Sequence, residues 1–332
     1  MNGIINVYKE KGYTSHDVVA IVRKNLYQNG FGRVKVGHTG TLDPDATGVL
    51  PVCIGRATKF AEYIAARDKT YIAEIVLGVT TNTGDITGDI LSQHPVVIDH
   101  GDIYQDKAEA FVDAKIVNVA QIEDVLRTFV YSNSGEYLQI PPMYSAIKIG
   151  GKKLYEIARK GGEIERPGRP VRIYALEIKR LVMRGEKEQH VQKNVFQVYV
   201  KCSKGTYIRT LAEDIGKMLG TGATMGALER VQSGVFCAET ALMLDDVKNM
   251  ICSGRVSEIM IPITDILQLP KMHVKQASIA HAQNGNPLQL TECEMLIDSS
   301  IADGDKFWLY NGEDIVGLYK YDGNKLRVEV KI

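Results

Sequence analysis

One segment constrains the fold more than any other stretch of this chain: residues 36–50, which read VGHTGTLDPDATGVL. Its glycines and its Asp-Pro step favour a tight loop, and the apolar residues that follow favour a buried strand over residues 49–54. A loop of this kind holds one carboxylate, that of Asp43, in a fixed pose at a surface cleft. The role of that carboxylate depends on the rest of the chain.

A carboxylate in such a loop can have one of four roles. It can simply begin a type I turn in front of Pro44. It can bind a metal together with Asp45, although the neighbouring sequence offers no histidine or carboxylate cluster to complete a coordination shell. A P-loop is excluded, because the glycines do not match G-x-x-x-x-G-K-[ST]. Finally, it can act without a metal as a lone nucleophile or base.

Composition limits the classes of protein that remain. The chain has 332 residues, 45% of them hydrophobic, which is enough for a large domain and a smaller one. Its formal net charge of +0 implies no general affinity for polyanions. Its five cysteines are scattered and form no C-x-x-C pair, which argues against a zinc site or a disulfide framework. We see no signal peptide and no membrane span, and expect a cytoplasmic protein.

Apolar periodicity and turn residues predict the main elements. Strands are expected over residues 4–8, 49–54, 70–78, 171–183, 195–202, 307–310, 315–321 and 326–330. Helices are expected after three capping positions, namely Thr14 or Ser15 (to about Leu26), Thr58, and Thr206 (to Leu219, before Gly220). The last of these helices places Tyr207 and Arg209 in or next to its first turn. The pattern changes near Pro270, which indicates a separate small β-domain.

Charge is distributed unevenly along the chain. Residues 80–125 contain nine acidic residues against two lysines, a net charge of −7. Residues 148–184 contain eleven basic residues against four glutamates, a net charge of +7, with glycines that indicate an exposed helix between mobile loops. A solvated charged face and a surface for nucleic-acid phosphates both explain the basic segment.

Taken whole, the 36–50 segment resembles the catalytic motif of the TruB-type tRNA pseudouridine synthases. Three further blocks follow in the order of that family: RATKF with DKTY (56–60 and 68–71), QIPPMYSAIK with GKKLY (139–148 and 151–155), and CSKGTYIRTL (202–211). The blocks span roughly residues 1–270, and the first and last are highly specific. The tail is similar to a PUA domain, a less specific match.

The resemblance implies a chemistry and its residues. Pseudouridine formation breaks the bond from uracil N1 to ribose C1′, turns the base and rebonds it through C5, so neither a cofactor nor a metal is implied. Asp43 would be the covalent nucleophile, attacking either C1′ or C6. Arg209 would pair with it and hold it ionised and oriented. A surface arginine is slightly disfavoured at a helix start, which itself favours a specific partner. Tyr71 would pack on the target base and handle the proton removed from C5.

Other residues match positions that bind the RNA. The target uridine has to be flipped out of folded RNA, and His38 would fill the vacated space by stacking. Three more residues match pocket positions: Lys59, Tyr207 and Leu228. The basic insertion carries Lys148, Lys152 and Lys153, and the resemblance favours RNA contact there over a solvated face. Outside the resemblance, Tyr71 and Leu228 would be ordinary buried residues of a sheet, and His38 a loop histidine of no assigned role.

The sequence therefore predicts an α+β protein with a mixed, mainly antiparallel sheet and a central cleft. We expect a catalytic domain over residues 1–265, an RNA-contacting insertion over about 131–170, and a PUA-like domain over 271–332. The expected activity is that of a monomeric, stand-alone enzyme acting on the T-loop uridine 55 of tRNA. The chain begins near its first strand and ends at its last, which favours this form over a guide-dependent relative in a ribonucleoprotein. A non-catalytic RNA-binding or RNA-folding protein is the other alternative. The acidic residues 94–113 depart from the family pattern and should point away from RNA.

Overall fold

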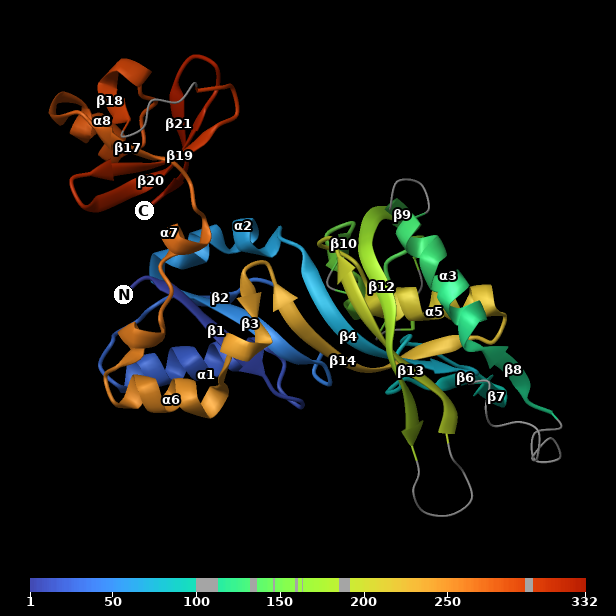
Figure 1. Cartoon of the computed structure of the whole chain (residues 1–332). Coiled ribbons are helices and arrows are strands. Elements are labelled where there is room, and N and C mark those ends of the chain that lie inside the picture. Colours follow the sequence, from blue (N-terminus) through green and yellow to red (C-terminus); the bar gives the residue numbers. More distant parts are fainter. Residues whose placement is uncertain are drawn as a thin grey trace.

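The computed structural model describes residues 1–99, 113–131, 136–145, 147–158, 161–162, 164–184, 192–295 and 301–332. Figure 1 shows one long twisted sheet with helices on it and a second, smaller sheet built by the C-terminal residues. Strands in the main sheet are mostly antiparallel, with parallel pairs at β1–β16 and β3–β14. The expected α+β class, with its mixed and mainly antiparallel sheet, is confirmed.

The main sheet follows the order β16-β1-β3-β14-β4-β13-β12-β9, with β2 beside β3 and β15 beside β14. Its strands are β1 (Gly3–Lys9), β2 (Val36–His38), β3 (Thr47–Ile54), β4 (Lys69–Leu77), β9 (Glu136–Gln139), β12 (Arg169–Arg184), β13 (Gln192–Cys202), β14 (Ala223–Ser233), β15 (Phe236–Cys237) and β16 (Leu242–Met243). Three two-stranded sheets are added by β5 (Val79–Thr81) with β6 (Ile90–Gln93), β7 (Val96–Asp99) with β8 (Lys115–Asn118), and β10 (Lys148–Ile149) with β11 (Lys152–Lys153).

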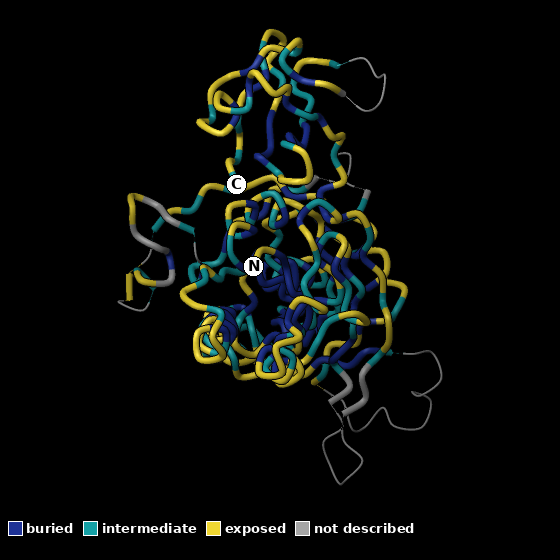
Figure 2. The backbone as a smooth tube through the Cα atoms, turned by 90° about the vertical axis from the view of Figure 1, so that its left-hand side faces the viewer, coloured by how far each residue is buried: buried dark blue, intermediate teal, exposed yellow. Residues whose placement is uncertain are grey.

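Helices cover the main sheet at both ends. The described helices are α1 (Ser15–Gln28), α2 (Ala61–Ala65), α3 (Val119–Tyr131), α4 (Leu154–Ala158), α5 (Ile208–Leu219), α6 (Leu244–Cys252), α7 (Ile263–Ile266) and α8 (Ile279–Asn284), of which α8 packs on the C-terminal sheet. At one end α1 and α6 lie side by side under β1 and β3, and at the other α3 and α5 pack against β4, β12, β13 and β14 (Figure 1). Figure 2 shows the buried backbone gathered between these layers.

Helix boundaries follow from local chemistry, in part as expected. Thr14 caps α1, and its side chain and that of Asp17 form a reciprocal capping box. Gly220 ends α5 in the left-handed conformation at φ 65°. The expected caps at Thr58 and Thr206 are wrong, because their hydroxyls donate backwards to carbonyl oxygens at Gly55 (2.7 Å) and Ser203 (2.9 Å). A 3₁₀ turn, η1 (Gly55–Phe60), precedes α2, and Tyr207 stands at the start of α5 without a side-chain cap.

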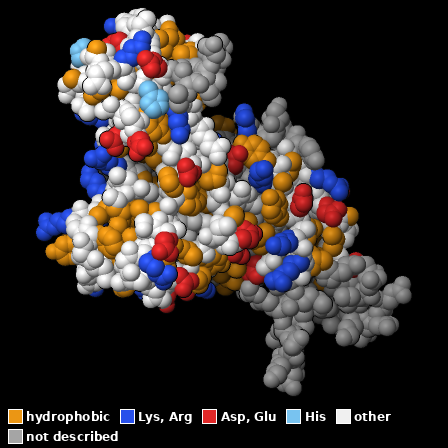
Figure 3. Space-filling model, turned by 60° about the vertical axis from the view of Figure 1, so that its left-hand side comes forward, with side chains coloured by type: hydrophobic (Ala, Val, Ile, Leu, Met, Phe, Trp, Pro, Cys, Tyr) orange, Lys and Arg blue, Asp and Glu red, His pale blue; other side chains and the backbone are white. Residues whose placement is uncertain are grey.

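The C-terminal residues build a five-stranded sheet in the order β18-β17-β19-β20-β21. Its strands are β17 (Lys271–Val274), β18 (Cys293–Met295), β19 (Lys306–Asn311), β20 (Asp314–Tyr321) and β21 (Leu326–Lys331). Figure 3 shows this sheet as a separate lobe above the rest, with acidic and basic side chains interspersed on the visible face. The three strands expected in the tail are therefore confirmed as β19, β20 and β21. Its assignment as a PUA domain, and the expected domain bounds, stay predictions.

Several expectations fall outside the described residues or reach only part of them. Residues 100–112 of the acidic segment lie outside, as do Arg159 and Lys160 of the basic one. The helix expected in the basic segment is the short α4, and much of the remaining basic sequence belongs to the regular strand β12. Among the described residues, the helices are all too short or too polar to span a bilayer.

Candidate active site

The loop that carries Asp43 is tied down from three sides. It joins the antiparallel strands β2 and β3. The Ser15 hydroxyl accepts from the backbone N–H of Leu42 at 2.8 Å and donates to its carbonyl at 3.1 Å. The Pro44 carbonyl accepts from Lys9 Nζ at 3.0 Å and from the N–H of Gly12 at 2.9 Å. The Asp43 side chain stays 44% exposed, so the loop presents its carboxylate rather than burying it.

Arg209, in the first turn of α5, forms an ion pair with this carboxylate. Its Nη2 lies 3.4 Å from Asp43 Oδ2, and its Nη1 lies 3.5 Å from Asp85 Oδ2. Nη1 also donates to the Thr83 carbonyl at 3.2 Å, and Nη2 to that of Tyr144 at 2.8 Å. The side chain is 9% exposed. A planar guanidinium suits this arrangement, because its fixed fork meets two carboxylates from different segments at once.

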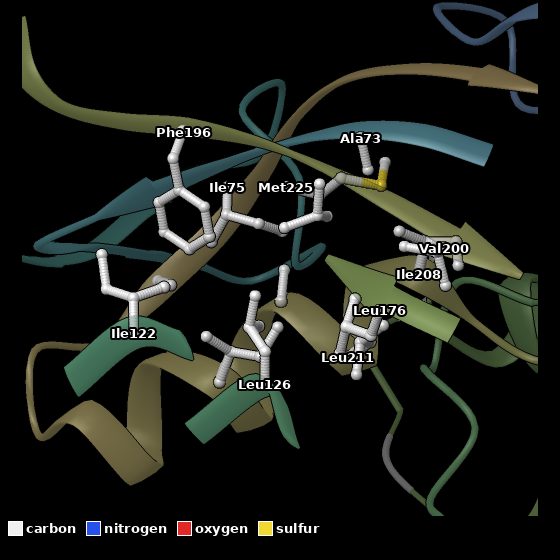
Figure 4. Packing of buried hydrophobic residues seen from close by; sticks show 14 of the residues in the cluster. Ala73, Ile75, Ile122, Leu126, Leu176, Phe196, Val200, Ile208, Leu211 and Met225 are labelled. Carbon is white, nitrogen blue, oxygen red and sulfur yellow. The ribbon is translucent and has the colours of Figure 1, made fainter. Parts of the chain in front are cut away.

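Packing fixes the helix that supplies Arg209. Ile208 and Leu211 flank it in the sequence and point into the buried cluster beside Val200 and Leu176 (Figure 4). Their burial leaves the N-terminal turn little freedom to rotate. Gln139 secures the backbone just before that turn, since its Oε1 accepts from the N–H of Tyr207 at 2.7 Å and its Nε2 donates to the Tyr207 carbonyl at 3.0 Å. The guanidinium is therefore preorganised.

Asp85 belongs to this site, and sequence reasoning missed it. It follows β5, where its Oδ1 accepts from the Thr83 hydroxyl (2.9 Å) and from the N–H (3.1 Å) and hydroxyl (2.6 Å) of Thr87. These bonds shape the turn and leave Oδ2 for Arg209. In the sequence, Asp85 looks like one of nine acids in an acidic segment. The Thr-Gly-Asp spacing signals a turn but not a distant arginine.

Tyr71 lies on β4. It is partly buried against the hydrophobic cluster between the sheet and the helices α3 and α5. Burial raises the pKa of its hydroxyl, and the charge and hydrogen bond of Arg230 oppose that rise. Leu228 on β14 packs partly buried against the same cluster. Tyr207 is also partly buried, and burial raises its pKa, with Arg209 and Asp43 both close enough to influence it. The structure thus gathers Asp43, Tyr71, Tyr207 and Arg209 in one region.

His38 ends β2 just before the loop. Its Nδ1 accepts from the N–H of Gly40 at 3.3 Å, which fixes the neutral ring with its proton on Nε2. Burial lowers the pKa of this imidazole, and the charges of Arg230 and His16 lower it further. The ring is therefore neutral near pH 7 and offers a stacking face rather than a charge.

Lys9 is a second residue that sequence reasoning missed. It is buried on β1, and its Nζ donates to the carbonyls of Glu10 (3.1 Å), Tyr13 (2.6 Å) and Pro44 (3.0 Å). Burial lowers the pKa of Lys9 to about 8, opposed by the charges of Asp43 and Asp45. The three accepting carbonyls tie the Asp43 loop to the turn that precedes α1.

The remaining predicted residues lie elsewhere or are only partly described. Lys59 donates to the carbonyl of Lys331 at 2.6 Å, so its amine contacts the C-terminal sheet. Lys148, Lys152 and Lys153 form the hairpin β10–β11, but their side chains fall outside the described part. Asp45 pairs with Lys11 at 3.6 Å. Asp43 and Asp45, the two ligands of the alternative metal site, thus pair with different basic side chains.

Comparison with known proteins decides the family. Residues 28–208 match the model of the TruB family pseudouridylate synthase N-terminal domain, and residues 209–268 match the tRNA pseudouridylate synthase B C-terminal domain. The chain belongs to the TruB family. It is a pseudouridine synthase, and hence an isomerase.

Individual relatives agree over nearly the whole chain. The tRNA pseudouridine synthase B of Alkaliphilus oremlandii is 45% identical over 319 residues, covering 96% of this chain and 92% of the relative. That of Bacillus pumilus is 39% identical over 334 residues, covering 100% and 93%. Among solved structures, a Cbf5-Nop10-Gar1 complex matches with a TM-score of 0.65 at 27% identity, covering 99% of this TruB-family chain and 84% of the other.

Proposed function

We propose that this chain converts uridine 55 in the T loop of tRNA to pseudouridine, with Asp43 as its one catalytic carboxylate. The ion pair between an exposed Asp43 and a buried Arg209 carries the proposal. Relatives that match almost the full length bear the name tRNA pseudouridine synthase B, which supports tRNA as the substrate.

Asp43 acts as the covalent nucleophile in this proposal. Its carboxylate is reachable from solvent, while Arg209 and the fixed loop orient it. Attack at ribose C1′ and attack at uracil C6 both suit one oriented carboxylate. Either way the N1–C1′ bond breaks, the base turns and a C5–C1′ bond forms. N1 gains a proton and C5 loses one, so the atoms balance without a redox partner.

Tyr71 faces the proton that leaves C5. Its ring packs with Leu228 against one apolar cluster, which supplies a flat wall for a uracil ring. Its hydroxyl takes the C5 proton in the last step. Arg230 favours the ionised form of this hydroxyl and burial disfavours it, so the rate should rise with pH as the phenolate forms.

His38 contacts the RNA and takes no part in the bond changes. A uridine in a folded loop has to leave its stack before Asp43 can reach it, and this costs a few kcal/mol of stacking. The neutral ring of His38, held by the N–H of Gly40, replaces part of that stacking. Lys148, Lys152 and Lys153 on the hairpin β10–β11 contribute positive charge for RNA phosphates.

The proposal is tested by incubating unmodified tRNA transcript, folded and then placed in chelator, with the wild-type chain and with Asp43→Ala. Pseudouridine is then mapped along the transcript by chemical modification and sequencing. We expect conversion at position 55 by the wild type and none by Asp43→Ala. A transcript with cytidine at position 55 is the substrate control. A wild type that leaves the T-loop uridine unchanged would show that the proposal is wrong.

The basic hairpin has its own test. Replacing Lys152, Lys153 and Arg159 by glutamine should weaken tRNA binding and flatten its dependence on salt, because each lost phosphate contact reduces the slope of log K against log salt by about 1. Lys248→Gln is the control, since this lysine pairs with Asp245 on its own helix at 2.7 Å. An unchanged slope would return the basic segment to the solvated-face interpretation.

A further inference from the structure

Arg230 lies in the sheet between the strand that follows the Asp43 loop and the strand that carries Tyr71. It is on β14, where it pairs with Gly48 of β3 and with Tyr71 of β4. Strand β3 follows the Asp43 loop directly, and β4 carries Tyr71. The approach to β3 is close: Gly48 has φ +107°, and a Cβ there would stand 2.2 Å from the Arg230 carbonyl oxygen.

The guanidinium of Arg230 is bonded to both sides of the site. Its Nε donates to the Val49 carbonyl at 2.8 Å, and its Nη2 donates to the Gly40 carbonyl at 3.0 Å. These two carbonyls lie on either side of Asp43 in the sequence. Arg230 also lies opposite Tyr71 on the neighbouring strand, close enough to lower the pKa of its hydroxyl. One planar group therefore bonds to the beginning of the Asp43 loop and to the strand after it, on a strand whose neighbour carries Tyr71.

The charge of Arg230 is costly where it stands. The side chain is 2% exposed, and no carboxylate lies within ion-pair distance of it in the described part of the chain. Burying a cation without a counter-ion is unfavourable, and an apolar residue would fill the same volume without that penalty. Its donors instead bond to the carbonyls of Gly40 and Val49. An unpaired buried charge behind two reacting groups is typical of a preorganised site.

We propose that Arg230 is a positioning residue for the isomerisation, whose buried guanidinium fixes the Asp43 loop to strand β14, opposite Tyr71. This inference rests on the roles proposed above for Asp43 and Tyr71. When the C5–H bond breaks, its electron pair restores the C5–C6 double bond and the proton goes to the phenolate oxygen of Tyr71. The positive charge of Arg230 favours the negative charge of that oxygen before the transfer.

Two variants separate charge from geometry. Arg230→Lys keeps the positive charge but loses the planar fork, and Arg230→Met keeps much of the volume and loses the charge. Arg180→Lys, an exposed arginine on β12 that donates to Gln197 at 2.8 Å, is the matched control. Single-turnover conversion of tRNA transcript is measured from pH 6 to pH 10, together with tRNA affinity and cooperative thermal unfolding.

We expect Arg230→Lys to bind tRNA as the wild type does and to convert it about 30-fold more slowly, the effect of one or two lost charged hydrogen bonds. For Arg230→Met we expect a lower rate throughout this pH range that still rises with pH, because burial holds the pKa of Tyr71 above the range and the charge that favours its phenolate is gone. Arg180→Lys should match the wild type.

Other outcomes overturn the inference. A wild-type rate in either variant, a rate in Arg230→Met that no longer rises with pH, or failure of both variants to unfold cooperatively would leave Arg230 with a purely structural role. The proposed function fails separately, and only if the wild type itself does not convert the transcript.

Discussion

Arg209 is held between two carboxylates, and neutralising the more buried one, Asp85, should slow the reaction. The change is Asp85→Asn. Oδ1 of the new amide can still accept from Thr83 and Thr87, so the turn after β5 should keep its shape. The other arm loses its charge 3.5 Å from Arg209 Nη1. The guanidinium is then attracted by Asp43 alone. It shifts towards Asp43 and makes that carboxylate a weaker nucleophile.

The size of the effect follows from distance and burial. Two unit charges 3.5 Å apart interact by about 5 kcal/mol at an effective dielectric constant of 20, which is an upper bound. Side chains that are 9% and 16% exposed are little screened by solvent. A charged hydrogen bond contributes about 1.5–3 kcal/mol net, and the long separation favours the lower half of that range. A loss of about 2 kcal/mol corresponds to a rate about 30-fold lower.

The assay is single-turnover conversion of tRNA transcript, with tRNA affinity measured alongside. We expect the slower rate with unchanged affinity, because Asp85 faces Arg209 rather than solvent. Asp89→Asn is the matched control: it lies in the same hairpin, and its carboxylate accepts from Asn82 at 2.9 Å. An Asp85→Asn enzyme within threefold of wild type would refute the idea that Asp85 helps to place Arg209.

Three further predictions concern stability. Burial lowers the pKa of Lys9 from 10.5 to about 8, so the unfolded chain binds more protons than the folded one between these pH values. The free energy of unfolding, measured by urea titration, should therefore rise with pH from about 8 to 10.5. Lys9→Met should abolish this rise. Burial also lowers the pKa of His38, so the free energy of unfolding should fall below about pH 6.5, and His38→Gln should remove that fall. Glu329 pairs with Lys306 at 2.8 Å and accepts from the hydroxyl of Tyr63, which joins α2 to the C-terminal sheet. Glu329→Gln should therefore cost about 1 kcal/mol and speed hydrogen exchange in β21, and unchanged exchange would contradict this.

The parts of the site that the sequence predicts well are local or carried by specific motifs. The Asp43 loop is marked by its glycines and Pro44, and the structure places it between two strands of the main sheet. Arg209 was expected to pair with Asp43, and the two side chains lie 3.4 Å apart. Their roles in the reaction stay predictions.

Residues that depend on long-range geometry could not be predicted. Arg230 reaches the Gly40 carbonyl because β14 pairs with β3, and Asp85 reaches Arg209 from a turn that bridges to Met225 of β14; neither residue has a local signal of its function. Lys59 is the opposite case. It lies in a recognisable sequence block that predicts a pocket position, but its amine contacts the Lys331 carbonyl in the C-terminal sheet. Thr58 and Thr206 were misassigned because a hydroxyl can bond backwards to a carbonyl as well as forwards to an N–H.

The central claim is that one carboxylate, held by Arg209, performs the isomerisation. The most direct measurement is single-turnover pseudouridine formation at position 55 by wild type and Asp43→Asn, in chelator, with tRNA affinity measured in parallel. The account predicts full conversion by the wild type, and none above background by Asp43→Asn at equal affinity. Conversion by Asp43→Asn at the wild-type rate, or a wild type whose chemistry requires a divalent metal, would contradict it.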